Sequence, residues 1–130
     1  MSRPGLGRHA GRRQALFLLY QWDLTGQPLA SLFEGEPDAF AASLAQAVSE
    51  RASDLDLRIT ETSREWPADR LGTLERNVLR TGVYELQEGT VPPEVAINEA
   101  VVLAKRYASE EAGRLVNGIL GRIAREEAAA

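Results

Sequence analysis

The sequence predicts an all-α protein, and three features of the chain lead to this expectation. Apolar residues recur every three or four positions, the spacing that places them on one face of a helix. The chain contains no alternating run of Val, Ile and Thr of the kind found in strands. Prolines, glycines and capping residues divide the periodic segments into six helices joined by short loops. We therefore expect one compact helical domain of two three-helix units.

The expected single domain, residues 1–130, has three parts. Residues 1–11 form a flexible basic arm, residues 12–66 hold the first three helices, and residues 67–130 hold the last three. The two units share one core, and the connection between Trp66 and Thr73 marks their junction. A chain of this length buries roughly two-thirds of its unfolded surface, so packing alone can stabilise it.

The first helix is expected over residues 12–24, and it is apolar nearly all round at residues 15–20. Such a helix is typically central and buried. Residues 26–37 form a loop rich in Gly and Pro. Pro37 then fits the first turn of the second helix, where Asp38 is favourable to the helix dipole. The apolar stripe of this second helix consists of Phe40, Leu44 and Val48.

Ser53, with Asp56 three residues later, resembles a capping box and is expected to open the third helix. Pro67 disfavours the helical conformation at Trp66, so the helix should stop there. Its buried face is expected to consist of Leu55, Ile59, Thr62 and Trp66.

The last three helices have clear boundaries in the sequence. The fourth covers residues 73–87 and ends at Gly89, Pro92 and Pro93 introduce the fifth, and Ser109 caps the sixth. Two glycines inside the sixth helix cost ~1 kcal/mol each relative to Ala, so we expect them to let another helix approach closely. These glycines are Gly118 and Gly121.

Composition argues against an enzyme, a metal site or a cofactor site. The chain has no Cys and one His, which excludes disulfides and Cys-ligated metals. His9 lies in the Gly- and Arg-rich N-terminus and is poorly placed to act as a general base. Glu110 and Glu111 are explained as acids at a helix N-terminus. The longest dense apolar run is far shorter than the ~20 residues that span a bilayer, so we expect a cytoplasmic protein without a membrane span.

The charge distribution is uneven although the net charge is −4. Residues 1–22 contain four arginines and no acid, and residues 23–130 contain the other 11 bases and all 19 acids. Such asymmetry is a signal for an anionic partner, although a solubilising basic tail would give the same pattern.

The basic cluster has a pattern typical of single-stranded RNA binding. Arg12 and Arg13 begin a helix, where the dipole disfavours cations by ~0.3–1 kcal/mol each, and Arg8 adds like charge. An external polyanion would offset this cost. His9 and Tyr20 share the side of the helix that carries Arg13, which places rings beside backbone-neutralising charge. A solvated tail and a core Tyr20 are the alternatives.

A second group of polar residues lies on the fourth and sixth helices. Their mixed charges suit a specific protein interface or a solvated helix face, and the residues alone leave both open. The group comprises Glu75, Arg76, Arg80, Glu111 and Arg114.

Three segments resemble the NusB family of bacterial transcription antitermination factors. RRQALFLLYQWDLTGQ at residues 12–27 is similar to the family's first helix. WPADRLGTLERNVLRTGVYEL at residues 66–86 and VPPEVAINEAVVLAKRYASEEAGRLVNGILGRIAR at residues 91–125 resemble its signatures, with the family's spacing between them. Residues 28–65 match only in helical pattern.

The resemblance implies a helical fold of two three-helix units and a protein that binds boxA RNA as a heterodimer with NusE, a small-subunit ribosomal protein. The pair would join NusA, NusG and RNA polymerase and suppress termination, notably in ribosomal RNA transcription. Family homodimers also occur. The implied RNA-binding residues are Arg8, His9, Arg12, Arg13 and Tyr20. The implied NusE surface consists of Glu75, Arg76, Arg80, Glu111, Arg114 and Leu115.

This chain departs from the family pattern at a few positions. Ala10 and Gly11 interrupt the basic run, which implies fewer phosphate contacts. Leu115 stands where an aromatic residue is common, and Gly72 stands where a capping Ser is common. Two other functions are open: an RNA-targeting accessory module of a ribosomal RNA methyltransferase, and a helical interaction module that does not bind RNA.

Overall fold

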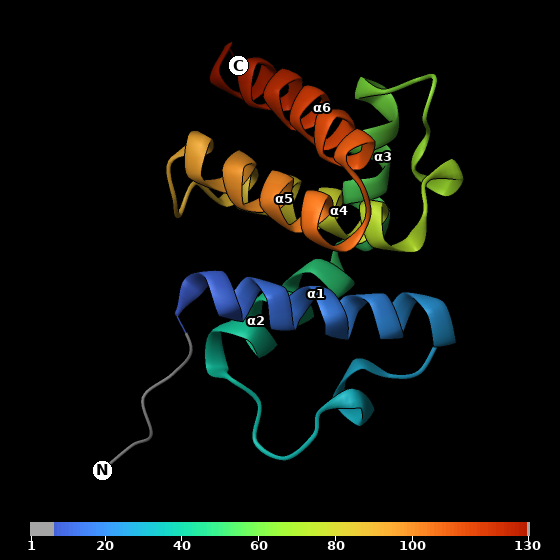
Figure 1. Cartoon of the computed structure of the whole chain (residues 1–130), viewed down its shortest axis with the longest axis vertical. Helices are drawn as coiled ribbons and strands as arrows, with labels where there is room; N and C mark the ends of the chain where they lie inside the picture. The colour runs from blue at the N-terminus through green and yellow to red at the C-terminus, as the bar shows by residue number, and fades with distance from the viewer. Residues whose placement is uncertain (1–6, 130) are drawn as a thin grey trace.

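The computed structural model describes residues 7–129, and in these residues it contains helices and no strands (Figure 1). The all-α prediction is confirmed. Two short 3-10 helices, η1 and η2, lie in the connections on either side of the second and third α-helices. The elements are α1 (Arg8–Thr25), η1 (Leu29–Leu32), α2 (Ala39–Glu50), α3 (Ala52–Thr62), η2 (Ala68–Arg70), α4 (Thr73–Glu88), α5 (Pro93–Tyr107) and α6 (Glu110–Ala129).

Helix α1 begins earlier than the sequence predicted. Its N-cap is Gly7 and its first residue is Arg8, so residues 8–11 belong to the helix rather than to a flexible arm. The rest of the expected arm, residues 1–6, lies outside the described residues. The helix ends at Gly26, which adopts a left-handed conformation with φ 72° and donates its N–H to the carbonyl oxygen of Trp22.

The starts of α2 and α3 differ from the predictions for a local reason. Asp38 is the N-cap of α2 and accepts a hydrogen bond from the Ala41 N–H at 3.0 Å, so Pro37 precedes the helix. The predicted capping box at Ser53 is wrong. Helix α3 starts at Ala52, directly after Arg51, whose own N–H still bonds to α2 carbonyls, so Ser53 is already inside the helix.

The end of α3 also lies upstream of the predicted position. The helix stops at Thr62, and Trp66 is 52% exposed rather than part of the buried face. The N–H of Ala68 bonds to the hydroxyl of Thr60 at 3.1 Å and holds η2 against α3. The other three residues of that face, Leu55, Ile59 and Thr62, are buried as expected.

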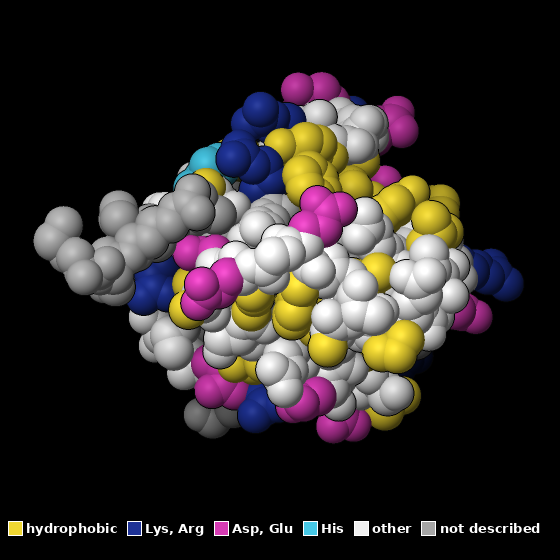
Figure 2. Space-filling model, turned by 90° about the horizontal axis from the view of Figure 1, so that it is seen from below, with side chains coloured by type: hydrophobic (Ala, Val, Ile, Leu, Met, Phe, Trp, Pro, Cys, Tyr) yellow, Lys and Arg dark blue, Asp and Glu magenta, His cyan; other side chains and the backbone are white. Residues whose placement is uncertain are grey.

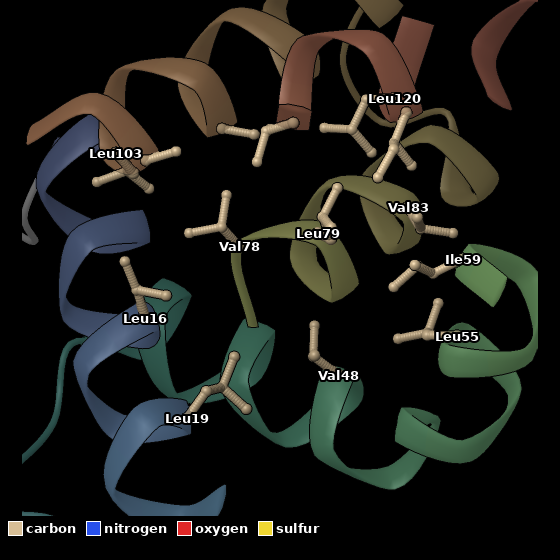
Figure 3. Packing of buried hydrophobic residues seen from close by; sticks show 14 of the residues in the cluster. Leu16, Leu19, Val48, Leu55, Ile59, Val78, Leu79, Val83, Leu103 and Leu120 are labelled. Carbon is tan, nitrogen blue, oxygen red and sulfur yellow. The ribbon is translucent and has the colours of Figure 1, made fainter. Parts of the chain in front are cut away.

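Helix α4 is the centre of the fold, because it contacts each of the other five α-helices. In Figure 1, α1 and α2 lie below α5 and α6, while α3 packs against α4 and α6 as well as α2. The core is therefore shared between the two halves of the chain. Figure 3 shows the buried side chains converging from all six α-helices. They include Leu16, Leu19, Val48, Leu55, Ile59, Val78, Leu79, Val83, Leu103 and Leu120.

Predicted boundaries in the C-terminal half are confirmed at three points. Gly89 ends α4 with φ 66°, Pro93 is the first residue of α5, and Ser109 accepts the Ala112 N–H at 3.0 Å at the start of α6. Within residues 7–129, no helix is both long enough and apolar enough to cross a membrane.

A glycine does permit a close helix contact, but it lies in α4 rather than in α6. A Cβ added at Gly82 would lie 2.5 Å from Cδ1 of the fully buried Leu120. No such neighbour exists within 4 Å at Gly118, and at Gly121 the nearest atom is Nη1 of Arg125 at 3.5 Å. The close-packing role predicted for Gly118 and Gly121 is therefore wrong, and Gly82 fulfils it.

These two environments predict opposite effects of the same substitution. Gly82→Ala should lower the free energy of unfolding by about 1–3 kcal/mol, because its methyl group overpacks the contact with Leu120. Gly118→Ala should raise it by up to about 1 kcal/mol, because it removes backbone entropy without a clash. Urea denaturation of both variants checks the pair, and stabilisation by Gly82→Ala would contradict the observed packing.

Candidate nucleic-acid interface

The inner face of α1 places a charged residue inside the core. Ala15, Leu16 and Leu19 are buried on this face, and so is Arg12, which is 4% exposed. Its guanidinium makes a bidentate pair with Glu85 of α4. Arg12 Nε donates to Oε1 at 2.8 Å, and Nη2 donates to Oε2 at 2.7 Å. Arg12 therefore joins α1 to α4.

The carboxylate of Glu85 stabilises the charge of the buried Arg12 guanidinium. Hydrogen bonds to the Glu85 side chain are the main cause of a raised Arg12 pKa, and they outweigh the opposing effect of burial. The guanidinium also lies 5.6 Å from the ring centroid of Phe40 on α2. Of the predicted RNA-binding residues, Arg12 is thus separated from solvent. The sequence did not reveal this because Glu85 lies 73 residues away.

His9, Arg13 and Tyr20 lie on the outer face of α1, whereas Arg8 lies one turn before Arg12 on the same side as that buried residue, at the start of the helix. Arg8 and His9 are exposed, and Arg13 and Tyr20 are half-buried. The Arg8 guanidinium stacks on Phe40 at 4.2 Å from the ring centroid, and His9 Nδ1 lies 2.7 Å from Oε2 of Glu99 on α5. Figure 2 shows Lys and Arg side chains gathered beside the histidine, with hydrophobic side chains adjoining them. This face can meet a polyanion.

Gly11 explains why the basic run is interrupted. Gly11 is buried where α1 crosses α2, and a Cβ there would lie 2.5 Å from Cδ1 of Phe40. A long basic side chain does not fit in this contact, so the interruption follows from packing between the two helices.

One exposed residue of α1 contradicts the expectation of a helix buried all round. Phe17 lies in the apolar run yet is 42% exposed, and its ring meets that of Tyr107 at the end of α5 in an edge-to-face arrangement. The ring centroids are 5.0 Å apart and the planes are at 79°. Sequence reasoning missed this seam between α1 and α5, because α5 cannot be placed beside α1 from periodicity.

Two of the residues predicted to bind a protein partner are largely turned inward. Arg80 donates from Nε and Nη2 to Asp56 of α3, both at 2.6 Å, and from Nη1 to Asp23 of α1 at 3.0 Å. Arg76 Nε donates to the same Asp23 oxygen at 3.0 Å. Asn77, fully buried, donates to it as well. This network ties α3 and the C-terminal half of α1 to α4.

The charge of Arg80 is maintained by its partners. Burial lowers its pKa, but the hydrogen bonds and charges of Asp56 and Asp23 raise it further, so the pKa lies above the ordinary value. Arg80 therefore stays charged, links α4 to α1 and α3 through Asp23 and Asp56, and is only 6% exposed.

The other four members of this set lie near the starts of α4 and α6. The Glu75 carboxylate lies over Gly72, where an added Cβ would meet Oε2. Glu75 thus folds back over the N-terminus of α4, whose N-cap Gly72 has no side chain to cap the helix. Glu111 and Arg114 are exposed on the first turns of α6, and Leu115 is half-buried against the core. Glu75 is itself half-buried, so Glu111 and Arg114 are the exposed charges among these four residues.

Comparisons with known proteins agree in family and fold. A model of the NusB family matches residues 9–125. The chain is 39% identical to the transcription antitermination protein NusB of an Exiguobacterium strain over 126 residues, covering 92% of this chain and 98% of that protein. A Rubrobacter xylanophilus protein of the same name is 39% identical over 122 residues, 88% of each chain.

Two solved structures share the fold. The NusB structure of T. maritima superposes with a TM-score of 0.83 at 32% identity, covering 95% of this chain and 94% of that one. A crystal structure of antitermination factors NusB and NusE in complex with double-stranded RNA gives 0.81 at 34% identity, covering 92% and 96%.

The burial of Arg12 predicts a stability effect that its neighbour lacks. Arg12→Ala should destabilise the protein by about 3–5 kcal/mol, because it leaves the Glu85 carboxylate buried without a partner. Arg13→Ala should change stability by no more than about 0.5 kcal/mol. Urea denaturation measures both. Replacing Arg12 and Glu85 together by Met should recover most of the loss, and an Arg12→Ala variant as stable as wild type would contradict the buried pair.

Proposed function

The chain belongs to the NusB family, and from this premise we propose that it is an RNA-binding transcription antitermination factor that pairs with NusE. The observation that carries the proposal is the outer face of α1. His9 and Arg13 lie on that face and Arg8 is exposed at the start of the helix, while the inner face is fixed in the core. Support also comes from the similar NusB that was solved with NusE and RNA.

RNA binding at this face would be largely electrostatic. Each arginine that neutralises a phosphate releases condensed counterions, which makes the affinity fall with salt. The half-buried Tyr20 supplies a ring on the same helix for contact with a base. Arg12 contributes indirectly, because its pair with Glu85 fixes the helix that carries the other residues. We propose boxA-type RNA as the ligand.

The NusE surface is proposed to consist of the four members of the second set that lie near the starts of α4 and α6. Glu111 and Arg114 present opposite charges on α6, and the half-buried Leu115 of α6 and Glu75 of α4 add an apolar and an acidic side chain. Arg76 and Arg80 contribute by holding α4 against α1 and α3 through Asp23 and Asp56. In this proposal Arg76 and Arg80 position α4 and do not themselves contact NusE.

The wider assembly follows from the same proposal. The heterodimer with NusE would join NusA, NusG and RNA polymerase in the cytoplasm and suppress termination, notably during ribosomal RNA transcription. A homodimer that covers the α1 face would compete with RNA.

The proposal is tested by titrating labelled boxA-type RNA with the full chain, with and without purified NusE, over a salt series. We expect binding that tightens when NusE is added, depends on the RNA sequence and weakens with salt. Absence of RNA binding in both conditions would refute the function and favour a module that binds protein only.

Loss of one arginine from the outer face of α1 should change the salt dependence of RNA binding. Arg13→Ala should weaken RNA binding and make the slope of log affinity against log salt shallower by about 0.7, the value for one single-strand phosphate contact. Arg64→Ala, which removes an exposed arginine after α3, is the matched control and should leave the slope unchanged. Equal slopes for both variants would remove Arg13 from the interface.

Charge reversal on α6 should affect the protein partner without affecting RNA contacts. Glu111→Arg should weaken NusE binding at least several-fold, because it places a cation in the proposed interface. Glu94→Arg is the matched control: Glu94 is also an exposed acid in the first turn of a helix, so the dipole cost is similar. Calorimetric titration with NusE gives both affinities, and wild-type affinity for Glu111→Arg would exclude Glu111.

A further inference from the structure

The seam between α1 and α5 carries an aromatic pair of which one ring packs against the core and the other is exposed. Tyr107 is half-buried and packs against the core, which fixes its position. Phe17 packs against Tyr107 from α1 and is 42% exposed. An exposed ring held by a second ring is a rigid surface for another planar group.

Positive charge borders this pair on both helices. Arg13 precedes Phe17 by four residues on α1, so the two side chains are neighbours on the helix surface. The Arg106 guanidinium lies 5.3 Å from the centroid of the Tyr107 ring. Further along the same seam, His9 pairs with Glu99, which is 20% exposed in its side chain. The aromatic pair therefore has one arginine beside it on each helix, Arg13 on α1 and Arg106 on α5.

The flanking arginines and the exposed ring together indicate that this surface binds single-stranded nucleic acid. An exposed aromatic ring flanked by arginines is the arrangement with which proteins hold single-stranded nucleic acid, because the ring stacks on a base while the cations neutralise the backbone. A docked helix would instead favour an uninterrupted apolar groove, and here arginines stand on both sides of the rings.

We propose that Phe17, held in place by the ring of Tyr107, forms a base-stacking platform for one unpaired nucleotide of the RNA, flanked by Arg13 and Arg106. The platform extends the RNA site from α1 onto α5 and rests on the proposed RNA-binding function. It gives the protein a contact with a base, in addition to contacts with phosphates.

The test uses the full chain with NusE and a boxA-type RNA in which 2-aminopurine replaces one nucleotide at a time. In the wild type, one position should lose fluorescence on binding, as stacking requires. Phe17→Leu keeps an apolar side chain against Tyr107 but removes the ring. It should abolish that quenching and weaken binding about 5- to 150-fold, the range for loss of one stacked base.

Leu57→Ala is the control, because Leu57 is 63% exposed on α3, outside the seam. It should leave quenching and affinity unchanged, and thermal unfolding of both variants separates a binding defect from a folding defect. Wild-type binding without any effect of Phe17→Leu would overturn the platform while leaving the proposed function intact. Weakened NusE binding by Phe17→Leu without RNA would reassign the pair to the protein interface. If the wild type binds no RNA, the proposed function itself fails.

Discussion

The buried pair between Arg12 and Glu85 is the constraint on which the arrangement of this protein depends. Each side chain is at most 6% exposed, and a charge in that environment is tolerable only beside its partner. Because the residues lie 73 positions apart, the pair selects the packing in which the start of α1 lies against the end of α4. In that packing His9 and Arg13 turn outward, and Arg8, one turn before Arg12, is exposed at the start of α1 beside Phe40.

A second group of charges fixes the other end of the same helix. Asp23, near the end of α1, accepts hydrogen bonds from Arg76, Asn77 and Arg80 on α4. Helix α1 is therefore held on α4 at both ends, with apolar packing between them. A helix held in this way presents its outer face with little freedom, and such preorganisation lowers the entropic cost of binding. The inner contacts of α1 thus support a function performed by its outer face.

The sequence predicted what depends on neighbours along the chain, including the helices, their caps at Gly89 and Ser109, and the apolar faces. Errors arose where contacts between distant segments decide the outcome. Arg12 looked like an exposed cation because its partner is remote, and Phe17 looked buried because the position of α5 was unknown. Gly118 looked like a packing glycine because composition cannot distinguish an open helix face from a crowded one.

The most direct test of this account is to map RNA binding on the 15N-labelled protein by NMR chemical-shift perturbation. The account predicts that perturbations concentrate on the outer face of α1 and continue across the seam to the end of α5, at Arg8, Arg13, Phe17 and Tyr107. The backbone around Glu85 should change little, because the buried pair is unaltered. Perturbations concentrated on α3 and the C-terminal half of α6 would contradict the account, since they would place the RNA on the opposite side.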